Sequence, residues 1–258
     1  MVSLKPKQQI DKLLPYGIIA TRKWLLSQGM SRHAIDNSLK SNKLRALSVG
    51  VYTRYDTPLS WQGIVYSLQK MSNEHICLGG LSALEQLGFG HYLRGSKFTT
   101  IHLYSEKKLP SWLNKLDLSM NFTWHSTKML WPDNMHSLGS FSREMLLNQG
   151  LTSIKVSCPE KAYLEMLMDV PKDISFDHAN EIIQGMTSLS PKKLETLLIT
   201  CKSIKVKRLF LWLAESQGYV WFNRLDVSKV DLGSGKRVIS QSGKLDKKYL
   251  ITVPKDLL

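Results

Sequence analysis

The stretch from Gly29 to Arg54, GMSRHAIDNSLKSNKLRALSVGVYTR, begins like a helix start, ends like a strand hairpin and contains one acidic residue, Asp36. Ser31 is a favourable N-cap, and the apolar residues after it follow a helical spacing. The short runs 44–47 and 49–52 are strand-like, with Ser48 and Gly50 near the turn between them. Gly50 allows a tight reversal of the chain. This stretch therefore predicts a polar helix joined to a two-stranded hairpin.

The residues before this stretch predict two more helices. Apolar positions in 8–14 have helical spacing, which Pro15 stops. Thr21 can cap a second helix, and Gly29 can end it in a left-handed conformation. Three helices followed by a hairpin predict a winged helix-turn-helix, with Val51 and Tyr52 packing the hairpin on the helices.

The polar face of the third helix is the candidate nucleic-acid reader. A helix of this kind fits the major groove of B-DNA, where Arg, Asn and Lys read base edges, and a wing can contact the backbone or the minor groove. Taken alone, the same face is typical of any solvated amphipathic helix. The expected DNA-binding residues are Arg22, Lys23, Ser31, Arg32, His33, Asn37, Lys40, Arg45 and Arg54.

The charge distribution favours the same reading. The formal net charge is +14, and residues 1–60 hold ten basic residues against three acidic ones. A surplus gathered at one end indicates a small nucleic-acid module attached to a larger body. The alternative is a basic surface without a polyanionic partner.

The remainder of the chain predicts a larger body. Helices are expected at 60–71, 82–87, 160–168, 176–186, 191–201 and 206–216, and strands at 99–104, 118–124, 153–156 and 249–253. The expected fold class is α+β, with an N-terminal winged helix-turn-helix at residues 1–58. A larger mixed, mainly helical domain with a small sheet follows at residues 59–258.

The body shows no pattern of a known catalytic centre. Asp177, His178 and Glu181 lack the HExxH spacing of a zinc site, and His75 with Cys77 is equally weak evidence for one. No GxSxG motif of a serine nucleophile is present. We therefore assign no catalytic, cofactor-binding or metal-binding residue and expect no enzyme activity. The basic run Lys202, Lys205, Lys207 and Arg208 could bind a partner protein or a nucleic acid, but a solvated surface is the favoured expectation. The glycine- and serine-rich segment 232–243 could be mobile.

Three scattered cysteines, with no CxxC pair, favour a reducing compartment. The first residues lack the apolar core of a signal peptide, and no run is long enough for a membrane span. These patterns predict a cytoplasmic protein with no membrane association.

At several places the sequence resembles the AbiEi antitoxins of type IV toxin–antitoxin systems, which belong to abortive infection and phage defence. The resemblance lies in LLSQGMSRHAIDNSLKSNKL, GVYTR, ICLGGLSALEQLGFG and SCPEKAYLEML, in that order. It implies a winged helix that represses its own operon and a C-terminal part that counteracts a nucleotidyltransferase-like toxin, with or without direct contact. The family's wing is often arginine-rich before its Gly-Val-Tyr, whereas Ser48 and Val49 stand here, which weakens the expected wing contact with DNA.

The leading hypothesis is thus an antitoxin that also represses transcription by binding inverted repeats in promoter DNA. Inverted half-sites imply that two copies act together on the double-stranded DNA. Two alternatives stay open: a metal-dependent nuclease that docks through its winged helix, and a transcription regulator without a toxin partner.

Overall fold

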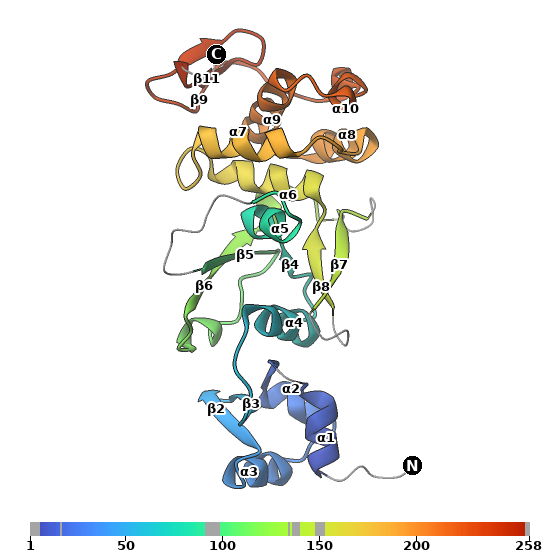
Figure 1. The fold of residues 1–258 in the computed structure, drawn as a ribbon, viewed down its shortest axis with the longest axis vertical. Helices are drawn as coiled ribbons and strands as arrows, with labels where there is room; N and C mark the ends of the chain where they lie inside the picture. The colour runs from blue at the N-terminus through green and yellow to red at the C-terminus, as the bar shows by residue number, and fades with distance from the viewer. Residues whose placement is uncertain are drawn as a thin grey trace.

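The computed structural model describes residues 6–15, 17–90, 99–133, 135, 140–147 and 153–255. Its elements are stacked along one long axis, with the N-terminal helices at one end and the last strands at the other (Figure 1). Helices and small sheets alternate along this axis, which confirms the predicted α+β class.

The N-terminal unit is a winged helix-turn-helix, as predicted. Its three-stranded antiparallel sheet has the order β1-β3-β2, so the structure adds a strand to the predicted hairpin. The added strand has three residues and is too short to show a periodicity in the sequence. The elements are α1 (Pro6–Leu13), β1 (Ile19–Thr21), α2 (Arg22–Ser27), α3 (Arg32–Lys40), β2 (Leu44–Ser48) and β3 (Val51–Arg54).

The helix-turn-helix of α2 and α3 follows from three local residues. Thr21 Oγ1 accepts from Trp24 N at 3.2 Å, and Ser31 Oγ accepts from Ala34 N at 3.1 Å, so both predicted caps are confirmed. Gly29 has a φ of +86°, and the next backbone N–H donates back to Leu25 O at 3.1 Å. This is a Schellman ending, which the glycine permits and which turns the chain sharply into α3.

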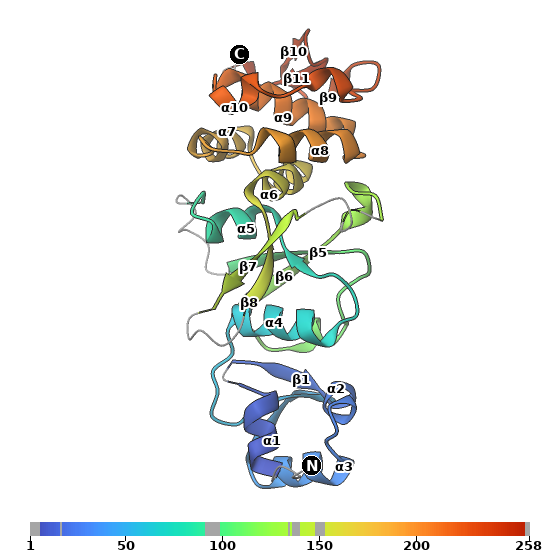
Figure 2. The ribbon, with the colours of Figure 1, turned by 90° about the vertical axis from the view of Figure 1, so that its right-hand side faces the viewer.

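A five-stranded sheet forms the centre of the body, in the order β6-β5-β4-β8-β7. α4 (Trp61–Met71) lies on one side of it, whereas α5 (Gly80–Gln86) and α6 (Pro159–Met166) lie on the other (Figures 1 and 2). β7 is a largely exposed strand at one edge of the sheet and was not predicted from the sequence. The strands are β4 (Cys77–Leu78), β5 (Thr99–Ser105), β6 (Met120–Ser126), β7 (Ser142–Leu146) and β8 (Ser153–Ser157).

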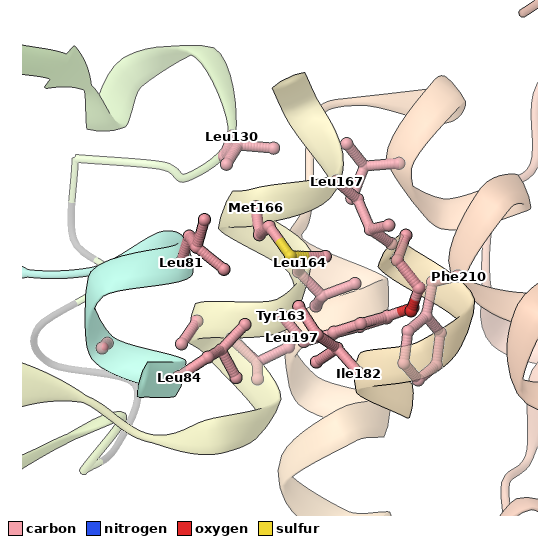
Figure 3. Packing of buried hydrophobic residues seen from close by; sticks show 14 of the residues in the cluster. Leu81, Leu84, Leu130, Tyr163, Leu164, Met166, Leu167, Ile182, Leu197 and Phe210 are labelled. Atoms are coloured by element: carbon pink, nitrogen blue, oxygen red, sulfur yellow. The ribbon is translucent and has the colours of Figure 1, made fainter. Parts of the chain in front are cut away.

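A helical layer follows the sheet and confirms the mainly helical second half. Figure 3 shows its core, where leucines of α5 and α6 meet Ile182, Leu197 and Phe210 from the outer helices. A last small sheet, β10-β11-β9, ends the fold. The elements are α7 (Phe176–Gly185), α8 (Pro191–Thr200), α9 (Ile204–Ser216), α10 (Val220–Asn223), β9 (Arg237–Val238), β10 (Lys244–Asp246) and β11 (Ile251–Val253).

The basic residues at the start of α9 correct one expectation. Lys207 and Arg208 are 3% and 1% exposed, so they are not solvated. Arg208 donates to the carbonyl oxygens of Leu232, Gly233 and Gly235 at 2.7 to 3.0 Å. The guanidinium thus satisfies part of the backbone of the segment 232–243, which also contains β9.

The winged-helix sheet contacts two cores, one on each face. Tyr52 packs on the helices of the winged helix, as predicted, whereas Ile19 and Val51 belong to the large core of the body. Ser67 Oγ of α4 accepts from Ile19 N at 3.0 Å. Apolar packing therefore continues from β1 and β3 into α4, past the expected boundary at residue 58.

Candidate nucleic-acid interface

The third helix, α3, separates buried and exposed residues along its length. Ile35 and Ser38 are buried, and Ala34 and Leu39 are half-buried, so these residues hold α3 on the winged helix. The opposite side carries the polar residues that the sequence predicted as base readers. Arg32, His33, Asn37 and Lys40 are all exposed.

Two of these exposed side chains contact each other. Asn37 Nδ2 lies 2.9 Å from His33 Nε2 and donates to it when that nitrogen carries no proton. The pair is spaced by one helical turn, and the contact leaves the amide oxygen of Asn37 as an acceptor. An asparagine on a recognition helix typically reads adenine through its amide in the major groove.

Arg22 connects α2 to α3 instead of pointing away from the protein. Its Nη2 donates to Asp36 Oδ1 at 2.7 Å, and this hydrogen bond raises the pKa of the guanidinium. Its backbone N–H donates to Gly50 O at 2.8 Å, in the turn of the wing. The residue therefore ties α2, α3 and the wing together.

The two predicted wing arginines also have partners within the protein. Arg45 Nη2 donates to Thr57 O at 3.2 Å, although the residue is exposed. Arg54 makes ion pairs with Asp11 at 3.2 Å and with Asp56 at 3.5 Å, and its side chain is 20% exposed. Arg54 would have to give up contacts in order to bind a phosphate, whereas the exposed Arg45 has further N–H donors that this one hydrogen bond does not use.

The cations best placed for phosphate contacts are those on exposed positions of the helices. Lys23 on α2 and Arg32 and Lys40 on α3 are exposed. Ser31 is exposed as well, with its hydroxyl engaged in the cap of α3. Lys43 is also exposed in the loop after α3 and was not among the predicted residues, although its place directly after the polar helix was a readable signal.

The tip of the wing carries an apolar residue. Val49 is fully exposed in the turn between β2 and β3, where its presence already weakened the wing contact expected from the family resemblance. A valine makes no ion pair with phosphate, so the basic character of the interface comes mainly from α2 and α3.

The body contains a polar cluster that the sequence did not indicate. His102 Nδ1 lies 2.9 Å from His125 Nε2, and Asp169 lies beside them. Burial and the neighbouring His125 lower the pKa of His102 to about 4. The cluster depends on the register of two strands far apart in sequence, for which we find no signal in the sequence. In contrast, His178 of the triplet noted above contacts Glu181 at 3.6 Å, and Asp177 is exposed.

A winged helix-turn-helix whose third helix exposes a polar face is typical of DNA-binding transcriptional regulators. Two family profiles match the chain along most of its length. The N-terminal domain of the AbiEi antitoxin family matches residues 4–95, and the transcriptional regulator AbiEi antitoxin of type IV toxin–antitoxin systems matches residues 99–254. The chain belongs to the AbiEi antitoxin family.

The fold also resembles that of a solved structure. The crystal structure of the RV2827C protein from Mycobacterium tuberculosis superposes with a TM-score of 0.56 at 16% sequence identity, covering 91% of this chain and 85% of that chain. At this identity the likeness extends to the fold alone. No curated protein matches the chain. Within the described residues, no helix combines the length and apolar character needed to cross a membrane.

Proposed function

We propose that the protein represses its own operon by binding an inverted repeat in promoter DNA, and that its body counteracts a nucleotidyltransferase-like toxin encoded beside it. In this division of labour, residues 1–58 bind DNA and residues 59–258 act as the antitoxin. The observation that carries the DNA-binding half is the exposed row Arg32, His33, Asn37 and Lys40, opposite the buried Ile35.

The fit between α3 and DNA is geometric and electrostatic. The tight turn at Gly29 lets α3 project its polar side from the protein, as the recognition helix of this motif does when it enters the major groove. Exposed Lys23 on α2 and Lys40 at the end of α3 supply cations. Base contacts then select the sequence, and phosphate contacts fix the position of the protein on the duplex.

An inverted repeat requires two copies of the winged helix. Half-sites read by such dimers lie one helical turn apart, about 34–36 Å, or a multiple of it. The elongated chain places its winged helix at one end, so two copies can approach a duplex with their bodies directed away from it (Figure 2).

Family membership supports the antitoxin role of residues 59–258. The profile of the antitoxin covers residues 99–254, which includes most of the body and none of the winged helix. A gene for a nucleotidyltransferase-like protein next to this one supports the antitoxin role. Its absence would favour a regulator without a toxin partner.

Promoter binding by the full chain tests the DNA-binding half. Fluorescence anisotropy with the promoter duplex should give tight binding for the wild type and strong loss when Arg32, His33, Asn37 and Lys40 are all replaced by alanine. The matched control is the double variant Lys236→Ala and Arg237→Ala. Like the loss of Arg32 and Lys40, it removes two positive charges, but from exposed positions at the C-terminal end of the fold. Wild-type binding by a folded quadruple variant would refute the assignment of α3.

A further inference from the structure

The parallel strands β5 and β6 and the end of α6 bring together two histidines and one aspartate, residue types that can bind a metal ion. β5 pairs with β6 so that Tyr104 lies opposite His125, and His102 lies two residues before Tyr104. Side chains two residues apart point to the same face of a strand, so His102, Tyr104 and His125 share one face of the sheet. Tyr104 lies against Gly79 and Gly80, which places this face on the side of α5 and α6.

The third side chain comes from the end of α6. That helix continues into a 3₁₀ turn, Leu167–Asp169, and Asp169 Oδ2 lies 4.0 Å from His125 Nδ1. One ligand atom from each of His102, His125 and Asp169 lies within 4.8 Å of the other two. Within the described part of the chain, no other group of three His, Cys, Asp or Glu side chains comes as close.

The two imidazoles are held in place by their surroundings. The Tyr104 ring stacks on His125 with the centroids 4.6 Å apart and the planes inclined by 11°. The backbone N–H of His102 donates to Ser82 Oγ at 2.9 Å, which fixes β5 against α5. All three candidate ligands are half-buried, so a cation could reach them from solvent.

We propose that His102, His125 and Asp169 form a binding site for a divalent transition-metal ion, best matched by Zn²⁺. Two imidazoles and one carboxylate form a ligand set that zinc takes in three-ligand sites, with a fourth position left for water or another group. Calcium and magnesium prefer oxygen ligands and fit this set poorly.

The fit requires a rearrangement at His125, because its Nε2 faces His102 whereas its Nδ1 faces Asp169, and an imidazole binds a metal ion through one nitrogen. Ligand atoms around a tetrahedral zinc ion are about 3.3 Å apart, given bonds of about 2.0–2.1 Å to nitrogen. His102 Nδ1 and His125 Nε2, at 2.9 Å, would separate by a few tenths of an ångström, and Asp169 would move closer. The alternative is a hydrogen-bonded cluster without a metal, in which one imidazole donates to the other.

The charges around the cluster act in both directions. Lys205 Nζ donates to Met168 O at 2.8 Å and lies close enough to Asp169 to oppose a cation. Asp173 interacts electrostatically with both His102 and Asp169, and its negative charge favours a bound cation. Lys172 also acts on Asp169, so a second carboxylate and two lysines lie near the proposed site.

Isothermal titration calorimetry of the full chain, stripped of metal, tests the proposal with ZnCl₂ and separately with MgCl₂. We expect one Zn²⁺ per chain and no Mg²⁺. His125→Gln and Asp169→Asn should each weaken Zn²⁺ binding by at least about 100-fold, more than the 10–100-fold lost when a residue only orients a ligand. His178→Gln is the control, because His178 contacts one carboxylate, that of Glu181, and should leave binding unchanged.

Cobalt distinguishes this site from the cysteines. Co²⁺ bound by imidazole and carboxylate shows visible d–d bands without the near-ultraviolet charge-transfer band of a thiolate ligand. A thiolate band would place the metal at Cys77, Cys158 or Cys201 and overturn the proposal. So would wild-type protein that binds no Zn²⁺, or a folded Asp169→Asn variant that binds it as tightly as wild type. If His125→Gln does not fold, Asp169→Asn, which keeps nearly the same shape, decides the question.

Discussion

Arg22 Nη2 donates to Asp36 Oδ1 across 2.7 Å and so joins the first helix of the helix-turn-helix to the second. Asp36 is the acidic residue of α3 and lies among its basic and polar side chains. The ion pair therefore orients α3, and at the same time it neutralises one cation of the proposed DNA interface.

Removal of that carboxylate should strengthen binding to DNA of unrelated sequence. Asp36→Asn keeps the size of the side chain, removes a negative charge and releases Arg22 for a phosphate. The slope of log affinity against log salt should become steeper by about 0.9, because Arg22 would neutralise one more phosphate. Anisotropy titrations over a series of salt concentrations measure this slope.

Asp117→Asn is the matched control, because Asp117 is an exposed carboxylate of the body. An unchanged slope for Asp36→Asn, together with unchanged affinity, would mean that Arg22 does not reach the DNA when it is released.

Asn37 should carry more of the sequence preference than any cation outside α3. Loss of a base contact costs about 1–3 kcal/mol at one position of the site. Asn37→Ala should therefore lower affinity for the operator while it leaves affinity for unrelated DNA nearly unchanged. Lys12→Ala, on α1, should change both affinities by a similar factor, and the ratio of the two affinities is the measurement.

The cations of the interface should differ in their contribution to salt dependence. Lys23 has an exposed side chain, whereas Arg54 is engaged by Asp11 and Asp56. Lys23→Ala should reduce the slope by about 0.9. Arg54→Ala should reduce it less and cost up to about 1 kcal/mol of stability through the lost ion pairs. Equal slopes for Arg54→Ala and Lys23→Ala would show that Arg54 leaves its partners when DNA binds.

Features that depend on neighbouring residues could be predicted from the sequence. The caps at Thr21 and Ser31 and the glycine ending of α2 depend on hydrogen bonds between residues at most five apart, so the helix-turn-helix and its exposed face could be predicted. The strand β1 was not, because Ile19–Thr21 becomes a strand only by pairing with β3, some 30 residues later. The burial of Arg208 likewise depends on carbonyl groups from a distant loop.

The cluster of His102, His125 and Asp169 shows the same limit. His102 stands in a predicted strand, and His125 lies one residue beyond the predicted strand 118–124, but their proximity depends on the parallel register of β5 and β6. Asp169 joins them only because α6 lies across that face of the sheet. Tertiary arrangement of this kind leaves no spacing in the sequence that could be recognised.

The contact between α4 and the winged helix should be sensitive to a single methyl group. A Cβ on Gly63 would lie 1.8 Å from Gly17 O, so Gly63→Ala forces α4 away from the turn that precedes β1. Overpacking of this kind costs about 1–3 kcal/mol, which lowers Tm by several degrees in a chain of this size. Thermal unfolding followed by circular dichroism measures the change.

Gly185→Ala provides the control, because its added Cβ would meet Phe89 at 3.9 Å, an ordinary contact. It should leave Tm unchanged or raise it slightly, since alanine favours a helix over glycine. An equally stable Gly63→Ala variant would mean that the winged helix and the body can shift apart without cost.

Repression and neutralisation of the toxin should separate when the exposed polar side chains of α3 are removed from the full chain. A fragment of residues 59–258 is a less clean test, because it would uncover the apolar surface of the body that Ile19 and Val51 cover. The quadruple alanine variant at Arg32, His33, Asn37 and Lys40 keeps that packing, because these side chains are exposed.

The most direct measurement follows both activities in the same cells, with a promoter reporter for repression and growth under expression of the neighbouring toxin for rescue. We expect the quadruple variant, present at wild-type levels, to lose repression and still to rescue growth. Loss of rescue together with loss of repression would contradict the proposed division of labour, because neutralisation of the toxin would then depend on DNA binding.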